Sequence, residues 1–325
     1  MGNFTHIADS FKNASGEYLK LDYYVLPENA DTAVKQFTQV KPMLSCFERF
    51  FGPYPFYRDG FKLVESPYLG MEHQSAVAYG NKYMNGYLGN DLSGTGEGLK
   101  FDYIIIHEAA HEWWGNAVTT KDIADMWVHE GFGQYAEALY LECTVGPESA
   151  QKYLNGLKRS VDNDSPIIGP YGVNEEGSGD MYPKGALLLN TIRHVINNDS
   201  IWFSVIKGLN MNFRYITTTS EDVEKYMSEK SGMDLSKIFK QYLRLKDLPI
   251  LEIERIQDGA DLIVKYRWIS PVTFFDMPVK ATNAYGDYVW IKPDIQMQSM
   301  RIQNMKKSSF KIDETDFYIK TKFID

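Results

Sequence analysis

Residues 101–132 read FDYIIIHEAAHEWWGNAVTTKDIADMWVHEGF, and this stretch carries the strongest pattern in the chain. It begins with a helical, strongly apolar block that ends near residues 115–116. Within that block His107 and His111 are four residues apart, so both imidazoles lie on one face of the helix and can reach a single ion. Glu108 lies one step round the helix, where its carboxylate can face a water on that ion. The pattern predicts a metal site on this helix.

A catalytic zinc site needs a third protein ligand and one open position for water. A second helical block begins near Asp122, and in it Glu130 follows His111 after eighteen intervening residues. This spacing allows a neighbouring helix to place the carboxylate of Glu130 beside the two histidines. A glutamate on a helix is usually a solvated side chain. The spacing favours Glu130 as the third ligand instead.

These residues resemble the gluzincin metallopeptidases of the aminopeptidase N family, whose zinc signature is H-E-x-x-H, eighteen residues, then E. The decapeptide HEAAHEWWGN is similar to the family's HELAHQWFGN, and residues 125–132 are similar to its second helix. The resemblance covers roughly residues 18–245. It implies a thermolysin-like catalytic domain that holds one Zn²⁺ per chain with His107, His111 and Glu130, uses Glu108 as general base, and acts on peptides.

Residues 181–186, MYPKGA, resemble the family's Tyr-x-Lys-Gly segment. The resemblance implies that Tyr182 is the phenol that hydrogen-bonds the oxyanion formed during attack, and a donor aimed at that charge contributes a few kcal/mol to catalysis. Taken by itself, one of 22 tyrosines is more often a packing residue. The flanking match favours the catalytic interpretation.

Residues 69–73, LGMEH, resemble the family's Gly-x-Met-Glu-Asn segment, in which the glutamate binds the free α-amine of the substrate. The resemblance implies that Glu72 binds this amine, with Gly70 and Met71 also contacting substrate. Leu69 and His73 depart from the family pattern. A side chain at the first position limits the approach of substrate to the backbone, and an imidazole changes donors and charge. His73 is either a substrate contact or a packed histidine.

His129 replaces the asparagine that usually precedes the ligand glutamate. Adjacent helical residues diverge by about 100°, so we expect a supporting residue and not a fourth ligand. His6 and His194 are expected to be surface or structural residues. Three tryptophans are expected to form an apolar wall round the site: Trp113, Trp114 and Trp127.

The rest of the chain predicts an α+β fold, with a mainly helical catalytic domain followed by a small all-β domain. Hydrophobic periodicity and turn residues predict the elements outside the zinc region. These are strands over 18–26, 61–65 and 75–79, helices over 31–51, 183–197, 220–231 and 235–245, and alternating segments over 250–256, 262–268, 279–282, 288–292 and 317–320. We expect three parts: residues 1–26, a remnant of an N-terminal β domain; residues 27–247, the zinc catalytic domain; and residues 248–325, a β-sandwich-like domain.

The composition excludes several classes of protein. The 325 residues carry a formal charge of −9, which argues against nucleic acid as a partner. No apolar run exceeds four residues, whereas a membrane helix needs about 20, so no membrane span is expected. Cys46 and Cys143 are too few for a disulfide framework and are expected to be buried thiols.

The first residues show neither the basic nor the apolar region that is typical of an export signal. Family members carry a large β-rich domain before the catalytic one, so we expect the sequence to be a piece of a longer chain. The sequence therefore does not distinguish a cytoplasmic protein from an exported one. It also does not indicate the oligomeric state.

The main functional prediction is a zinc aminopeptidase. The altered residues Leu69 and His73 leave open a zinc endopeptidase or a hydrolase of narrow specificity on the same core. A catalytically silent relative that only binds peptides is the alternative from another class of protein, although every residue needed for catalysis is present.

Overall fold

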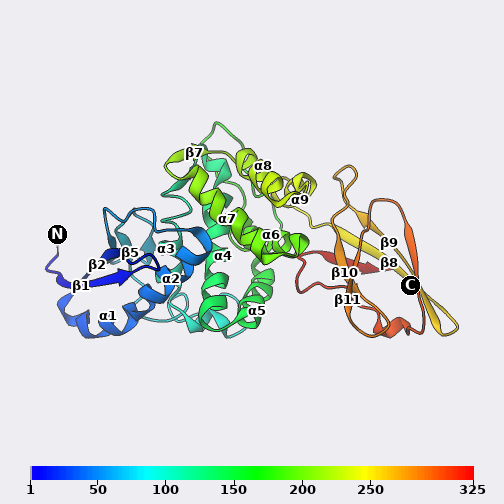
Figure 1. Cartoon of the computed structure of the whole chain (residues 1–325), viewed down its shortest axis with the longest axis horizontal. Coiled ribbons are helices and arrows are strands. Elements are labelled where there is room, and N and C mark those ends of the chain that lie inside the picture. The colour runs from blue at the N-terminus through cyan, green and yellow to red at the C-terminus, as the bar shows by residue number, and fades with distance from the viewer. Residues whose placement is uncertain (1) are drawn as a thin grey trace.

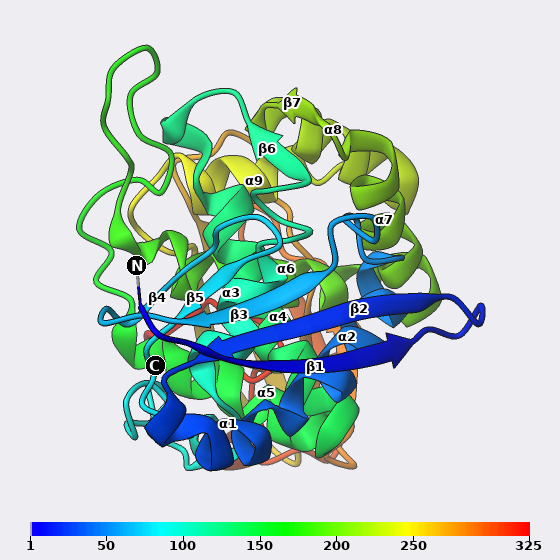
Figure 2. The ribbon, with the colours of Figure 1, turned by 90° about the vertical axis from the view of Figure 1, so that its left-hand side faces the viewer.

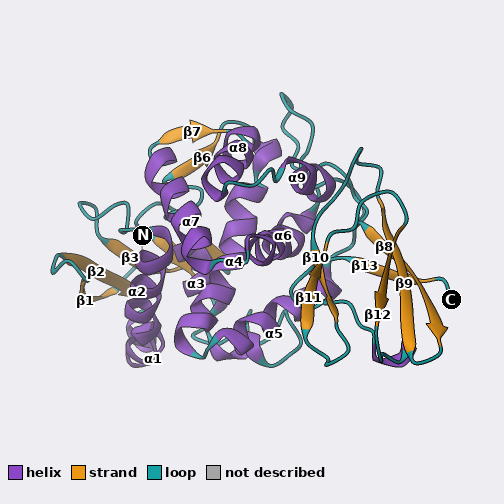
Figure 3. Cartoon of the chain, turned by 45° about the vertical axis from the view of Figure 1, so that its right-hand side comes forward, coloured by secondary structure: helices purple, strands orange, loops and turns teal. Residues whose placement is uncertain are grey.

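The structure is a computed structural model that describes residues 2–325. A body of helices occupies the middle of the molecule, with one sheet at the N-terminal end and a β domain at the C-terminal end (Figures 1 and 3). This arrangement confirms the α+β fold class that the sequence predicts.

The N-terminal sheet has five strands in the order β1-β2-β3-β5-β4, and Figure 2 shows it in front of the helices. Strands β2, β3 and β5 run parallel, while β1 and β4 pair antiparallel at the two edges. The strands are β1 (Thr5–Lys12), β2 (Tyr18–Val25), β3 (Phe61–Glu65), β4 (Gly70–Met71) and β5 (Val77–Tyr79). The boundary expected at residue 26 therefore lies between two paired strands, and the three-part division stays a prediction.

The helical body packs around α4, which contacts α2, α3, α5 and α6. The helices are α1 (Ala30–Gln36), α2 (Val40–Phe51), α3 (Tyr103–Ala110), α4 (Trp127–Thr144), α5 (Pro147–Leu157), α6 (Pro183–Ile196), α7 (Asp199–Phe213), α8 (Ser220–Ser231) and α9 (Ser236–Leu243), with a short parallel pair β6 (Val118–Thr120) and β7 (Ile216–Thr218). The helix expected over 31–51 is divided into α1 and α2 by a 3₁₀ turn at Phe37–Gln39. Helices α5 and α7 were not anticipated. None of the helices within residues 2–325 combines the length and the hydropathy that crossing a bilayer requires.

The C-terminal domain is all β, as expected. A four-stranded sheet has the order β12-β9-β8-β13, and β10 pairs with β11. The strands are β8 (Ile250–Asp258), β9 (Asp261–Ile269), β10 (Val279–Thr282), β11 (Tyr288–Ile291), β12 (Gln298–Ile302) and β13 (Lys320–Phe323). Strand β12 was not anticipated, and β13 begins where the strand expected over 317–320 was to end.

The β domain is joined to the helical body by buried hydrogen bonds. The Tyr242 hydroxyl donates to the carbonyl of Tyr318 at 2.6 Å, and the amide of Tyr318 donates to the Thr191 hydroxyl at 3.0 Å. The buried ammonium of Lys184, at the start of α6, donates to the carbonyl of Lys246 at 2.6 Å. These contacts fix the linker and the last β segment against α6 and α9.

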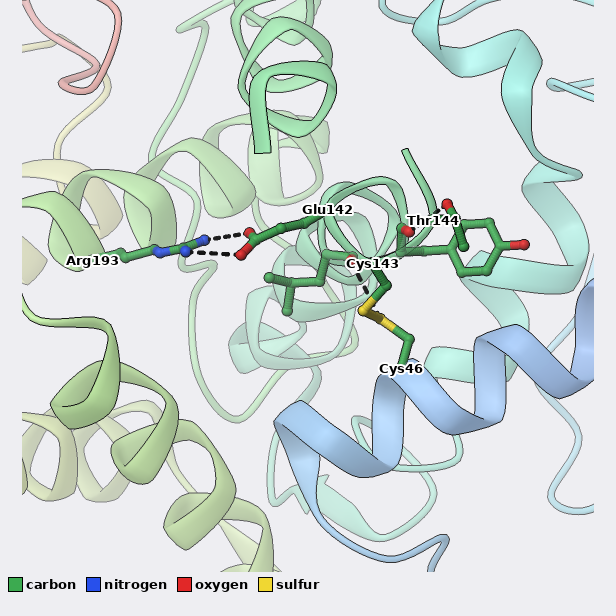
Figure 4. Close-up of a disulfide and its surroundings, with 7 residues drawn as sticks. Cys46, Glu142, Cys143, Thr144 and Arg193 are labelled. Atoms are coloured by element: carbon green, nitrogen blue, oxygen red, sulfur yellow. Dashed lines mark hydrogen bonds and ion pairs between the residues drawn. A yellow bond between two sulfur atoms is a disulfide. The ribbon is translucent and has the colours of Figure 1, made fainter. Parts of the chain in front are cut away.

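The prediction of two buried thiols is wrong, because Cys46 and Cys143 form a disulfide (Figure 4). Cys46 lies on α2 and Cys143 near the end of α4, and their Cα atoms are 6.1 Å apart. That separation is within the range that a disulfide spans. The two residues are 97 positions apart in sequence, so only the packing of α2 against α4 brings them together.

Candidate active site

Helix α3 is anchored at its N-terminus by a buried aspartate. One oxygen of Asp102 accepts the backbone N–H groups of Ile104 and Ile105, at 3.1 and 3.3 Å. Its other oxygen accepts the Tyr79 hydroxyl at 2.7 Å and the Gln36 side-chain amide at 2.8 Å. An N-cap of this kind satisfies donors that a helix otherwise leaves unpaired. It also ties the helix that carries His107, and that ends directly before His111, to strand β5.

The three predicted zinc ligands meet in a nearly equilateral triangle. The Nε2 atoms of His107 and His111 are 3.2 Å apart, and each is 3.3 Å from Oε2 of Glu130. Zinc binds such donors at about 2.0–2.1 Å with tetrahedral geometry, which places donors about 3.3–3.4 Å from one another. All three side chains are buried. The donor set and its spacing therefore fit a zinc ion.

The opposite ring nitrogens of both histidines are hydrogen-bonded. Nδ1 of His107 is 2.7 Å from a carboxylate oxygen of Glu137, and Nδ1 of His111 is 2.9 Å from the carbonyl oxygen of Trp114. Both partners can only accept, so each Nδ1 carries the proton and donates it. Each Nε2 is then free to ligate a metal, and such partners orient the ring and raise ligand basicity.

Sequence reasoning missed Glu137, which is fully buried on α4 and also accepts the Tyr153 hydroxyl. A signal was present, because Glu137 lies seven residues after Glu130 and therefore on the same face of α4.

The electrostatics of the site favour a bound cation. When no metal is bound and the imidazoles are protonated, burial works to raise the pKa of Glu130, but the charge of His111 and hydrogen bonds from both rings outweigh it and hold this pKa below its ordinary value. Burial likewise works to lower the pKa of His107, and hydrogen bonds to Glu130 and Glu137 raise it overall. Buried carboxylates therefore stabilise positive charge at the imidazoles.

Glu108 is buried beside the triangle. Burial raises its pKa, the two imidazoles oppose that shift, and the charges of Glu72 and Glu130 add to it. A carboxylate whose pKa is raised in this way holds a proton more readily, as a general base must do during a reaction.

Two glycine positions on α4 make room for the site. A Cβ on Gly133 would lie 3.2 Å from Cε1 of His107 and 3.4 Å from Cε1 of His111. A Cβ on Gly185 of α6 would lie 2.9 Å from the Cα of Gly131. Helices α4 and α6 therefore cross with their backbones in direct contact.

Tyr182 immediately precedes α6, so this crossing brings it to the triangle. Its ring centroid lies 6.0 Å from that of His107, with the two rings nearly parallel. Burial raises the pKa of Tyr182, and the charge of Glu130 together with hydrogen bonding to it adds to the shift. The phenol therefore stays protonated and can donate a hydrogen bond.

The edge strand β4 lies against the general-base candidate. A Cβ on Gly70 would be 3.0 Å from a carboxylate oxygen of Glu108 and 2.8 Å from a side-chain carbon of Ile104. Met71 is exposed, and Glu72 follows it half-buried. His73 is exposed and is therefore not the packed histidine that was one of its two interpretations.

His129 and the three tryptophans lie near the site without entering it. Nε2 of His129 accepts the backbone N–H of Thr120 on β6 at 3.0 Å, and burial, together with the charge of His111, lowers the pKa of His129 to about 4. This ring is a neutral hydrogen-bond acceptor that links α4 to β6. The three tryptophans are fully buried, and the Trp114 ring stacks on Phe132 at 4.1 Å.

Comparison with known proteins places the chain among aminopeptidase-like sequences. It is 24% identical over 217 residues to endoplasmic reticulum aminopeptidase 1 of Mus musculus, covering 63% of this chain and 23% of that protein. It is 22% identical over 275 residues to probable aminopeptidase 1 of Sulfurisphaera tokodaii, covering 80% and 34%. It is 25% identical over 217 residues to aminopeptidase N of Lactococcus lactis subsp. lactis, covering 61% and 24%. The chain thus spans about a quarter to a third of the length of these curated relatives.

The fold is similar to that of aminopeptidase A of Legionella pneumophila, solved in complex with aspartic acid. The TM-score is 0.74 at 15% identity, and the alignment covers 100% of this chain and 39% of that one. The Peptidase family M1 domain matches residues 35–242, well over half of the chain. The matched span contains β4, both histidines, Glu130 and Tyr182. The chain belongs to peptidase family M1.

Proposed function

We propose that the protein is a zinc-dependent aminopeptidase that hydrolyses N-terminal residues from peptides. The observation that carries this proposal is the buried triangle of two Nε2 atoms and one carboxylate oxygen, 3.2–3.3 Å apart, with Glu108 beside it. The aminopeptidase names of the relatives support the choice among peptidases.

In this proposal His107, His111 and Glu130 hold one Zn²⁺. When bound, zinc supplies a Lewis acid that polarises a carbonyl group and acidifies water. Glu108 accepts the proton of the attacking water and then delivers it to the nitrogen of the leaving amine. Tyr182 donates a hydrogen bond from its hydroxyl to the oxyanion that develops on the scissile carbonyl.

Glu72 would bind the free α-ammonium group of the substrate. Its charge contributes to the raised pKa of Glu108, so the two carboxylates are close enough to interact. Gly70 has no side chain that would crowd the carboxylate of Glu108. Met71 would contact substrate from the exposed side of β4.

The proposal is tested by zinc analysis and by hydrolysis of aminoacyl and N-acetylated fluorogenic substrates, with and without a chelator. We expect about one zinc per chain and chelator-sensitive cleavage of the free-amine substrates alone. Equal cleavage of both kinds of substrate would favour an endopeptidase or another hydrolase. Bound zinc without cleavage would favour a silent, peptide-binding relative.

The Glu108→Gln variant should lose turnover by a factor of about 10² or more, because an amide cannot take up the proton of the attacking water. Its zinc content should match that of the wild type. Glu148→Gln, which removes an exposed carboxylate on α5, is the control and should change neither quantity. Retained turnover in Glu108→Gln would refute its assignment as the base.

A further inference from the structure

The segment that follows Glu72 is a tight turn with an unusual backbone. The amide of Ala76 donates to the carbonyl of His73 at 2.9 Å, which closes the turn. Ser75 lies inside it with φ +57°, in the left-handed region that residues other than glycine adopt rarely. A residue keeps such a conformation when its surroundings hold it there.

The group that holds Ser75 is the side chain of Glu112. One carboxylate oxygen of Glu112 accepts the backbone N–H of Ser75 at 2.6 Å. Glu112 is fully buried, and among residues 2–325 its second oxygen has no hydrogen-bond partner. Burying a carboxyl group with so few partners is unfavourable. An apolar side chain would suit the core better, so the bond to Ser75 is the distinctive contribution of this residue.

A second side chain is hydrogen-bonded to the other end of the same segment. The Asn116 side-chain amide donates to the backbone carbonyl of Glu72 at 2.9 Å. The amide of Asn116 in turn donates to the carbonyl of His111 at 2.9 Å. Residues 72–75 are therefore held at both ends by the short segment that begins with the zinc-ligand candidate His111 and includes its immediate neighbour Glu112.

We propose that Glu112 is a positioning residue that sets the distance between the amine-binding carboxylate of Glu72 and the zinc position. This inference rests on the proposed aminopeptidase function. Glu112 reaches Glu72 only through the backbone of the turn, and it contacts neither Glu108 nor the ligand atoms by any hydrogen bond among the described residues. Its loss should therefore weaken recognition of the α-ammonium group and leave the bond-breaking step largely intact.

The test compares two substitutions of similar size. Glu112→Met removes the acceptor and keeps an unbranched, buried side chain, while Glu112→Gln keeps an oxygen that can accept from Ser75. For a free-amine substrate we expect Glu112→Met to raise KM about tenfold, with kcat within about threefold of the wild type and zinc content unchanged. Glu112→Gln should restore KM to within about threefold. A fall in kcat of about tenfold, with KM unchanged, would overturn the proposal.

Hydrogen exchange measured by mass spectrometry provides a readout that does not depend on activity. The amides of residues 72–76 should exchange at least tenfold faster in Glu112→Met than in the wild type or in Glu112→Gln, while those of β8 stay unchanged. Equal protection of residues 72–76 in all three proteins would refute the proposal that Glu112 holds this turn.

If Glu112→Met does not fold, Asn116→Asp provides the second variant, since it removes the donor to Glu72, and it should raise KM in the same way. A wild-type protein that cleaves free and acetylated substrates equally would contradict the aminopeptidase proposal. The exchange result would then decide by itself whether Glu112 holds the turn.

Discussion

At the scale of single residues, the partners of the imidazoles matter as much as the ligands themselves. His107 donates from Nδ1 to Glu137 at 2.7 Å, and the carboxylate fixes both the orientation of the ring and the position of its proton. This contact joins α3 to α4 directly behind the zinc position.

Glu137→Gln should weaken zinc binding about tenfold, because a neutral amide is a poorer acceptor and no longer raises the basicity of the ring. The apparent zinc affinity can be measured by competition with a chromogenic chelator at constant pH. Glu148→Gln is again the control. An affinity equal to that of the wild type would mean that Glu137 has only a packing role.

At the scale of helices, the crossing of α4 and α6 positions Tyr182, the residue proposed to bind the oxyanion. Gly131 and Gly185 face each other there, and Tyr182 stands at the start of α6, three residues before Gly185. Any side chain at the crossing separates the two helices and moves Tyr182 away from Glu130.

Gly185→Ala should therefore lower both stability and turnover. Overpacking of this kind costs about 1–3 kcal/mol, which urea unfolding would measure. We expect kcat to fall at least tenfold while zinc content stays unchanged, since the three candidate ligands lie on α3, directly after α3, and on α4. Gly179→Ala, whose Cβ would meet nothing within 4 Å, is the matched control. A stable, fully active Gly185→Ala protein would show that the crossing tolerates separation.

The disulfide is a second contact between helices, and it links α2 to the C-terminal end of α4 (Figure 4). Cys143 lies 13 residues beyond Glu130, or about 20 Å along the helix. The bond therefore stabilises the packing of the helical body without touching the zinc position.

The double variant Cys46→Ala/Cys143→Ala should be less stable than the wild type by about 2–4 kcal/mol, with its zinc content unchanged. Urea unfolding with and without a reductant measures this difference. Reductant should bring the wild type towards the double variant, and the double variant should not respond to it. If reductant leaves the wild type unchanged, the thiols are not bonded in the protein.

At the scale of the whole molecule, the helical body and the β domain meet round His194. Its Nδ1 lies 3.2 Å from a carboxylate oxygen of Asp316. Burial lowers the pKa of His194 to about 4, and the charges of Arg193 and Lys280 act in the same direction. The charges of Asp313 and Asp199 oppose this shift without cancelling it.

This lowered pKa predicts a definite pH dependence of stability. Between pH 4 and 6.5 the unfolded chain binds more protons at His194 than the folded protein, so stability rises with pH through that window and is fully present above it. His194→Gln should make the free energy of unfolding change less steeply between pH 6.5 and 4, as measured by urea unfolding. Above pH 7 the curves of variant and wild type should run parallel. An unchanged slope below pH 6.5 would mean that His194 titrates normally.

The sequence by itself predicted those features whose residues follow the period of one helix or one strand. His107, Glu108 and His111 follow from helical spacing alone, and the resemblance over the following eighteen residues pointed to Glu130. Alternating and helical periods likewise indicated the α+β class, although the amphipathic helix α7 was overlooked. Such features depend on neighbours within a few residues, whose geometry the regular backbone sets.

Only the tertiary structure decided the contacts between distant segments. The pairing of Cys46 with Cys143, the crossing at Gly131 and Gly185, and the bond from Glu112 to Ser75 all join residues whose spacing has no period. Each depends on how whole helices and strands pack, and packing is a property of the assembled core that no local pattern encodes. The sequence alone thus predicted the ligands and chemistry of the candidate zinc site, and the packed fold determined which side chains hold those groups in place.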